Sequence, residues 1–200
     1  MTETNKLTTW ILWILAAAYA AALEACPDDA DLHSGRGLAL GALGDYVEAA
    51  AEFRRAIVLR PHDYDLHYEL GVALGRQGRH AEAEVALRAA IRLRPDGLKA
   101  RANLALGLGR QGKHAEAEAT YREALALRPV HPALHRGLGV ALYWQGRYAD
   151  ADARYHGVAQ LDIKLRDTNY QRAAHRYALD PKPTLGYRRP TGSNVDAHGA

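Results

Sequence analysis

Small and apolar residues recur with helical spacing through the middle of the chain. In residues 64–97, Leu70 and Leu74 are four positions apart, which places both on one face of a helix. Leu87 and Ala90, three positions apart, mark a second helical face further along the same segment. The pattern predicts two short helices, each with an apolar stripe that must pack against another helix.

Glycine and proline separate these predicted helices. Gly78 lies between the two patterns, at a place where helices often end in a left-handed residue. Pro95 follows the second pattern and stops it, because proline has no N–H to donate and restricts the residue before it. The segment is therefore predicted to be helix, tight turn, helix, turn.

The same unit recurs every 34 residues. Prolines have this spacing at Pro27, Pro61, Pro95 and Pro129. Glycines have it at Gly44, Gly78, Gly112 and Gly146. Small residues in the first helix let the two helices of a pair approach closely, at Gly37, Gly71, Ala105 and Gly139. Larger residues in the second helix are expected to fill the gap between successive pairs, at Phe53, Leu87, Tyr121 and Tyr155.

These units resemble tetratricopeptide repeats (TPRs), which are 34 residues long, carry L-G in helix A and A-x3-F/Y/L in helix B, and close with a proline. The resemblance implies an all-α fold, a helix-turn-helix solenoid with a right-handed superhelical twist. Four full repeats are expected, at 30–63, 64–97, 98–131 and 132–165. One position departs from the family pattern, since the tryptophan usual early in helix A is replaced by His33, His67, Arg101 and His135.

The N-terminal segment 1–29 has two interpretations. Residues 10–23 carry no charge, but they fall short of the ~20 residues needed to span a bilayer. In the first interpretation the segment contains helix B of a half repeat, because Tyr19 and Pro27 continue the 34-residue phase. Its unpaired face would then allow a homodimer. In the second, residues 7–26 form a signal or membrane-anchor segment. The first implies a cytoplasmic protein, and the second an exported or membrane-anchored one.

The period ends before the C-terminus. Residues 166–180 are predicted to form a capping helix, since repeat arrays need a final helix with one polar face. Residues 181–200 are rich in proline and glycine and are predicted to be a flexible basic tail. The whole chain carries a formal net charge of only +3, which is too little to indicate nucleic-acid binding.

No catalytic, metal or cofactor site is predicted. Five of the ten histidines that invite such an interpretation recur with the repeat, which is typical of a structural role. The single cysteine, Cys26, has no visible base beside it, and no H-E-x-x-H or Cys/His cluster occurs. We therefore expect a non-enzymatic protein with no small-molecule substrate.

The resemblance implies a binding surface as well. In TPR proteins helix A lines a concave face that holds extended or helical peptides, through the second, fifth, sixth, ninth, twelfth and thirteenth positions of each repeat. The candidate groove residues are Leu38, Tyr68, Glu69, Val72, Arg76, Lys99, Asn103, Leu106, Arg110, Arg136, Val140, Tyr143 and Trp144. They supply an apolar floor, three aromatic anchors (Tyr68, Tyr143 and Trp144) and several charges.

The charges in this set are unevenly distributed. The first two repeats contribute the acids Asp31, Asp65 and Glu69, and the last two contribute the cations Lys99, Arg110 and Arg136. We expect the acidic part of a ligand to lie against these cations. The resulting hypothesis is a protein-interaction scaffold or adaptor that binds a peptide segment. The alternative is an exported or membrane-anchored assembly factor of the cell envelope, similar to TPR proteins of pilus assembly.

Overall fold

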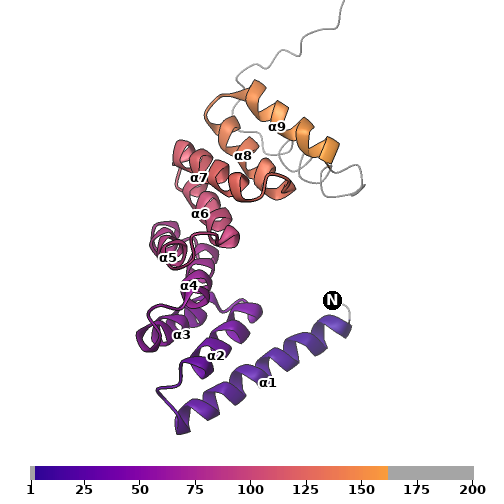
Figure 1. Ribbon diagram of the computed structural model, residues 1–200. Coiled ribbons are helices and arrows are strands. Elements are labelled where there is room, and N and C mark those ends of the chain that lie inside the picture. The colour runs from indigo at the N-terminus through magenta and orange to yellow at the C-terminus, as the bar shows by residue number, and fades with distance from the viewer. Residues whose placement is uncertain (1–2, 162–200) are drawn as a thin grey trace, which may run out of the picture. The chain divides into compact units, whose positions relative to one another are not determined.

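The computed structural model describes residues 3–161, and in this part of the chain it contains helices and no strands (Figure 1). The first helix is α1, Glu3–Ala25. Four helix pairs follow, with bounds α2 Ala30–Leu43, α3 Tyr46–Leu59, α4 Tyr64–Arg76, α5 His80–Leu93, α6 Leu98–Arg110, α7 His114–Leu127, α8 Pro132–Trp144 and α9 Tyr148–Leu161. The predicted capping helix at 166–180 and the tail at 181–200 lie outside the described residues.

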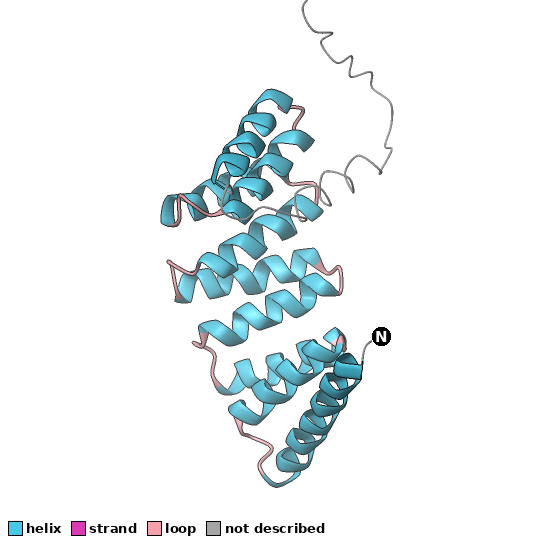
Figure 2. Cartoon of the chain, turned by 90° about the vertical axis from the view of Figure 1, so that its right-hand side faces the viewer, coloured by secondary structure: helices cyan, strands magenta, loops and turns pink. Residues whose placement is uncertain are grey.

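Each helix packs against the next one in the chain, so that the pairs stack in order (Figure 2). The A helices also contact each other across repeats, since α2 reaches α4, α4 reaches α6, and α6 reaches α8. The described B helices make no comparable contacts with one another. The A helices therefore lie on the shorter, inner side of the stack. This arrangement confirms the predicted all-α TPR solenoid.

The tight turns inside the pairs depend on glycine. Gly44, Gly78, Gly112 and Gly146 have φ angles of 97°, 79°, 78° and 77°. A residue with a β-carbon rarely adopts this left-handed conformation, whereas glycine adopts it without steric cost. The predicted left-handed helix ends are therefore present in every pair, and they set the sharp reversal between helix A and helix B.

Glycines within helix A allow the two helices of a pair to approach closely. A β-carbon added at Gly37 would lie 2.8 Å from Cε1 of Phe53, and one at Gly71 would lie 2.6 Å from Cγ of Leu87. The core around these contacts consists mainly of alanine and leucine, as the near absence of phenylalanine in the sequence indicates. The small residues of helix A and the large residues of helix B thus contact each other within one repeat, whereas the large residues were expected to fill the gap between successive pairs.

The C-terminal half of α1 packs as helix B of a preceding repeat would. A β-carbon at Gly35 would collide with the ring of Tyr19, just as one at Gly137 would collide with Tyr121. In each pair the tyrosine precedes the glycine by 16 positions, so Tyr19 contacts repeat 1 as Tyr121 contacts repeat 4. Ala16 is also buried. Residues 16–25 therefore extend the repeat packing toward the N-terminus.

The residues that replace the usual tryptophan of helix A anchor the turn before each repeat. Nε2 of His33 lies 2.8 Å from the carbonyl oxygen of Pro27, and His67 and His135 make the same contact with Pro61 and Pro129, at 2.9 and 2.8 Å. In repeat 3, Arg101 donates to the carbonyl of Pro95. The periodic histidines thus have the structural role that their recurrence predicted, through a hydrogen bond and not through packing alone.

Candidate peptide groove on the A helices

The ninth position of each repeat forms an apolar line along the A helices. Leu38 and Leu106 are each about half exposed, at 50% and 51%. Val72 and Val140 hold the same position in the other two repeats and are half-buried. Partly exposed aliphatic side chains on the inner side of the stack can contact a ligand without loosening the core beneath them.

Polar side chains of α4 and α6 meet at the centre of this line. Asn103 donates from Nδ2 to Oη of Tyr68 at 3.4 Å and to the carbonyl of Lys99 at 3.0 Å. The ring of Tyr68 stacks on that of Tyr64 with 6.1 Å between centroids. The structure therefore brings together Tyr68 of repeat 2 and Asn103 of repeat 3, two candidate groove residues from neighbouring repeats.

Glu69 brings a half-buried carboxyl to the same centre. Burial raises its pKa, the nearby Asp65 carboxylate raises it further, and Lys99 partly offsets both. Burial likewise raises the pKa of the neighbouring Tyr68 hydroxyl. Among the described contacts Glu69 has no ion pair and no hydrogen bond from its side chain. This carboxyl is therefore the least compensated acid of the groove.

The other groove acids are already paired, which changes the charge pattern expected from the sequence. Asp31 forms an ion pair with Arg60, and Asp65 lies 3.9 Å from Arg94. Both arginines come from turns between repeats. The acidic half of the predicted groove is consequently largely neutralised by its own structure.

The groove cations are not neutralised in this way. Among the described residues, none of the following forms an ion pair: Arg76, Lys99, Arg110 and Arg136. All but the half-buried Arg136 are exposed. The inner face therefore has an excess of unpaired positive charge, which is concentrated in repeats 2 to 4.

Two of the three predicted aromatic anchors lie at the edge of the groove and not at its centre. Tyr143 packs edge-on against Tyr148, with 5.1 Å between ring centroids. Trp144 stacks on His114, the first residue of α7, at 6.0 Å. They are 50% and 56% exposed. Tyr143 and Trp144 thus form an aromatic patch at the intrarepeat turn of repeat 4, whereas Tyr68 lies on the groove floor.

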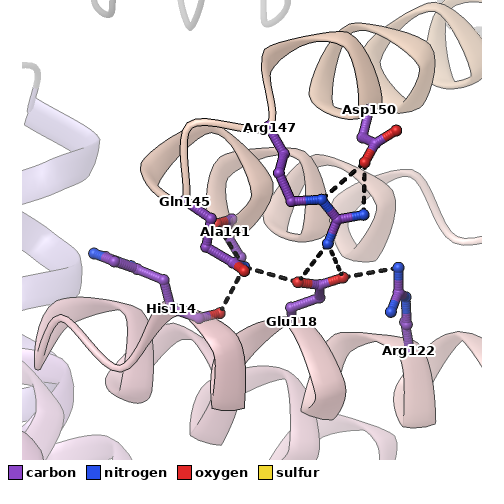
Figure 3. A network of polar contacts seen from close by, with 7 residues as sticks. All are labelled: His114, Glu118, Arg122, Ala141, Gln145, Arg147 and Asp150. Atoms are coloured by element: carbon purple, nitrogen blue, oxygen red, sulfur yellow. Dashed lines mark hydrogen bonds and ion pairs between the residues drawn. The ribbon is translucent and has the colours of Figure 1, made fainter.

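The junction between repeats 3 and 4 contains a buried carboxylate that the sequence analysis missed (Figure 3). Glu118 is 6% exposed and accepts a 2.8 Å hydrogen bond from Gln145. Arg147 and Arg122 reach it at 2.9 and 2.7 Å. Gln145 also donates to the carbonyl of His114 at 3.3 Å. The carboxylate thus connects helix B of one repeat to the turn of the next.

The junction between repeats 2 and 3 is built in the same way around Glu84. Gln111 donates to this carboxylate at 3.1 Å, and Lys113 reaches it at 2.9 Å. Lys113 therefore pairs with a carboxylate of the preceding repeat, across the junction. The signal that could have revealed these junctions is the 34-residue recurrence of Gln77, Gln111 and Gln145 beside Glu84 and Glu118.

Hydrogen bonds and charges keep these junction carboxylates ionised. The pKa of Glu84 is lowered to about 2, chiefly by the hydrogen bond from Lys113, although burial acts in the opposite direction. For Glu118, by contrast, burial is the largest single influence, and it acts to raise the pKa. The hydrogen bonds from Gln145 and Arg147 and the two nearby guanidinium charges outweigh it, so that the pKa is lowered.

Repeat 1 has its own buried carboxylate, Glu52, which is 3% exposed. Nδ1 of His33 lies 2.6 Å from it, and Arg36 and Arg55 donate to it at 2.9 Å each. These contacts fix α2 against α3 and leave the carboxylate oxygens occupied. A group engaged by three neighbours in this way has a structural role and is not poised for acid–base chemistry.

Metal-binding and nucleophilic groups do not converge in the part of the chain that the structure describes. There, no three residues among histidine, cysteine, aspartate and glutamate are grouped so that they could hold a metal ion. Cys26 is exposed, at the turn that follows α1. The described surface does carry exposed aliphatic side chains, stacked aromatic rings and cations without ion pairs.

Comparison with known proteins identifies the family. The family model described as "Tetratricopeptide repeat" matches residues 16–64, 35–97 and 102–153, and a search of curated proteins gave no match. One similar structure is a crystal structure of MamA, with a TM-score of 0.72, 22% identity, and coverage of 75% of this chain and 88% of MamA.

Two further structures have the same fold. MamA 41-end from Desulfovibrio magneticus RS-1 has a TM-score of 0.72 and 21% identity, covering 84% of this chain and 99% of its own. YrrB, described as a TPR protein with an unusual peptide-binding site, has a TM-score of 0.72 and 23% identity, covering 84% of both chains. At these identities the likeness concerns the fold alone. Together with the family model, which covers more than half of the sequence, it establishes that this chain belongs to the tetratricopeptide repeat family.

Proposed function

We propose that the chain is a non-enzymatic adaptor whose A helices bind a segment of a partner protein that carries both acidic and apolar side chains. Tetratricopeptide arrays are protein-interaction scaffolds, so the general class of function follows from the family. The single observation that carries the finer proposal is the set of unpaired cations on the inner face, beside half-exposed leucines.

The proposed ligand follows from the chemistry of this face. Leu38 and Leu106 offer apolar surface that a leucine or similar side chain would cover. Lys99 and Arg136 offer positive charge that would attract carboxylates and speed association. Tyr68 on α4, which accepts a hydrogen bond from Asn103, adds an aromatic side chain to this face. YrrB, which shares the fold, has a peptide-binding site by its description, and this supports a peptide as the ligand.

We propose a cytoplasmic location for the repeat array. Residues 16–25, which removal of an export signal would take away, cover Gly35 of repeat 1 through Tyr19. Their loss would uncover the packing face of α2. The observation supports retention of this segment in the working protein, and the mass of the protein recovered from its native cells would test it.

The direct test of the ligand uses three matched peptides. Each has the same leucines, and the intervening positions are glutamate in one, glutamine in the second and lysine in the third. Fluorescence anisotropy with the full chain should rank their affinities in that order, and the advantage of the glutamate peptide should shrink as salt is added. Equal affinity for all three peptides would contradict the proposal.

A further inference from the structure

The N-terminal half of α1 carries a concentration of exposed apolar side chains. In Figure 1 this half of the helix runs past the end of α2. Six of its large apolar residues have exposed fractions between 41% and 71%, and they are Leu7, Trp10, Ile11, Trp13, Ile14 and Leu15, whereas Leu12 is half-buried. Such a continuous apolar surface marks an interaction site.

The two halves of α1 belong to different environments. Ala16 is 5% exposed, Tyr19 packs over Gly35, and the family model matches from residue 16 onward. Nothing in the family pattern or in the packing of the described residues requires Trp10 or Trp13 to be tryptophan. The apolar surface of residues 7–15 therefore serves something other than the array.

The distribution of these side chains favours lipid over a protein partner. With 100° between successive residues, the six side chains span about 200° of the helix circumference. A partner helix covers a stripe of roughly 100°. A specific protein interface also needs about 20–30 residues on each side, which residues 7–15 do not provide. Lipid chains, by contrast, can surround a helix on every free side.

The length of the exposed segment decides how it would enter a membrane. Residues Leu7–Ala25 are long and apolar enough to cross a bilayer, and almost none of this stretch is buried. Residues 16–25 nevertheless remain packed on α2. The free part, residues 7–15, is about 14 Å long, less than half of the ~30 Å hydrocarbon core.

We propose that residues 7–15 insert into one leaflet of a lipid bilayer and tether the repeat array to the membrane surface. Trp10 and Trp13 would lie at the boundary between headgroups and acyl chains, which tryptophan prefers. Because residues 7–23 carry no charge, the attachment needs no anionic lipid and resists salt. The groove on the A helices remains open to a soluble partner.

The test is flotation of the full chain with vesicles of pure phosphatidylcholine. The wild-type protein should float with the vesicles in both low and high salt. The triple variant Trp10→Gln, Trp13→Gln, Ile14→Gln should show a vesicle-bound fraction lower by about tenfold or more. A matched control, Val58→Gln with Val85→Gln, changes apolar residues that are 81% and 69% exposed on other helices and should float like the wild type.

Further measurements on these variants distinguish membrane binding from the other possible roles of this surface. The changed side chains are exposed, so circular dichroism and the melting temperature should stay at wild-type values. Failure of the wild type to float, or flotation that the triple variant retains, would overturn the proposal. Release by high salt would overturn it in favour of the basic tail at 181–200. A dimer that the triple variant abolishes, without vesicle binding, would assign the surface to a second copy. A native protein that lacks residues 1–15 would assign it to a removed leader.

Discussion

Charged side chains are paired at the junctions between repeats, whereas several on the inner face of the array are not. At the junctions, Glu84 and Glu118 are nearly buried, and hydrogen bonds or ion pairs from the next repeat reach both. On the inner face, Lys99 and Arg136 have no ion-pair partner among the described residues.

The difference separates the charges that hold this fold together from those that are free to act on something else. A paired, desolvated carboxylate stabilises the structure and offers little to a ligand. An unpaired surface cation contributes little to stability, but it can attract a partner. The comparison predicts that mutations in the two regions change different measurements.

Charge reversal on the inner face should have the largest effect. In the variant Lys99→Glu, Arg136→Glu, affinity for the leucine–glutamate peptide should fall on the order of 100-fold, because two attractions become repulsions. The free energy of unfolding should stay within about 0.5 kcal/mol of wild type. Anisotropy titrations and urea unfolding measure the two quantities.

The matched control for this variant is Arg92→Glu, Arg128→Glu. Both arginines are exposed and lie on or beside B helices, so the net charge changes equally while the inner face is untouched. If the control weakens peptide binding as much as the inner-face variant does, the effect is one of total charge and the groove assignment fails.

Removal of a junction carboxylate should show the opposite behaviour. Glu118→Ala should lower the free energy of unfolding by about 2 kcal/mol, because Gln145, Arg147 and Arg122 lose a buried acceptor. Peptide affinity should remain within about twofold of wild type. Glu116→Ala, a change at an exposed acid two residues earlier on the same helix, should cost less than ~0.5 kcal/mol. Equal losses of unfolding free energy for the two variants would contradict the special structural role of the buried junction carboxylate.

The contribution of Glu84, at the junction between repeats 2 and 3, to the free energy of unfolding should depend on pH. Because the pKa of Glu84 is lowered to about 2 in the folded chain, its stabilising effect is present above its unfolded pKa and is lost as the pH falls toward 2. Glu84→Gln should therefore unfold more easily than wild type by about 2 kcal/mol at pH 7. This gap should close between pH 4.5 and 2 in urea titrations. A gap that does not change with pH would mean that the charge of Glu84 plays no part.

The uncompensated acid of the inner face should give the smallest effect, with the reverse sign. The raised pKa of Glu69 means that folding disfavours its ionised form, a cost that is present at neutral pH and disappears as the pH falls through the folded pKa. Glu69→Gln should stabilise the chain by a few tenths of a kcal/mol at pH 7, after allowance for solvent screening. The acidic peptide should bind about two- to fivefold tighter. Weaker binding by this variant would show that Glu69 attracts the ligand instead.

The fold was predictable because its determinants repeat within the sequence. Turn glycines such as Gly78 and helix-stopping prolines such as Pro95 act locally, and their 34-residue spacing shows that each acts in every unit. The interlocking of Gly71 with Leu87 also lies within one repeat. Local chemistry that recurs is what a single sequence displays most clearly.

The candidate site was less predictable because its charged and aromatic residues contact partners far away in the sequence, either in the same repeat or in a neighbouring one. Arg60 and Arg94 neutralise Asp31 and Asp65 from turns some 29 residues away. Burial of Glu118 depends on residues 27 to 29 positions later. Trp144 stacks on His114 of the preceding repeat, 30 positions earlier. Such partners are set by how helices and turns pack within a repeat and between neighbouring repeats, which periodicity alone does not specify.

The claim that the A helices form the binding face is tested most directly by mapping the bound peptide on the full chain. Backbone amide chemical shifts would be recorded by NMR as the leucine–glutamate peptide is added. The account predicts that the largest changes occur on the inner side of α4, α6 and α8, at Val72, Asn103, Leu106 and Val140. Changes concentrated on the B helices α3, α5 and α7, with the A helices unaffected, would contradict it.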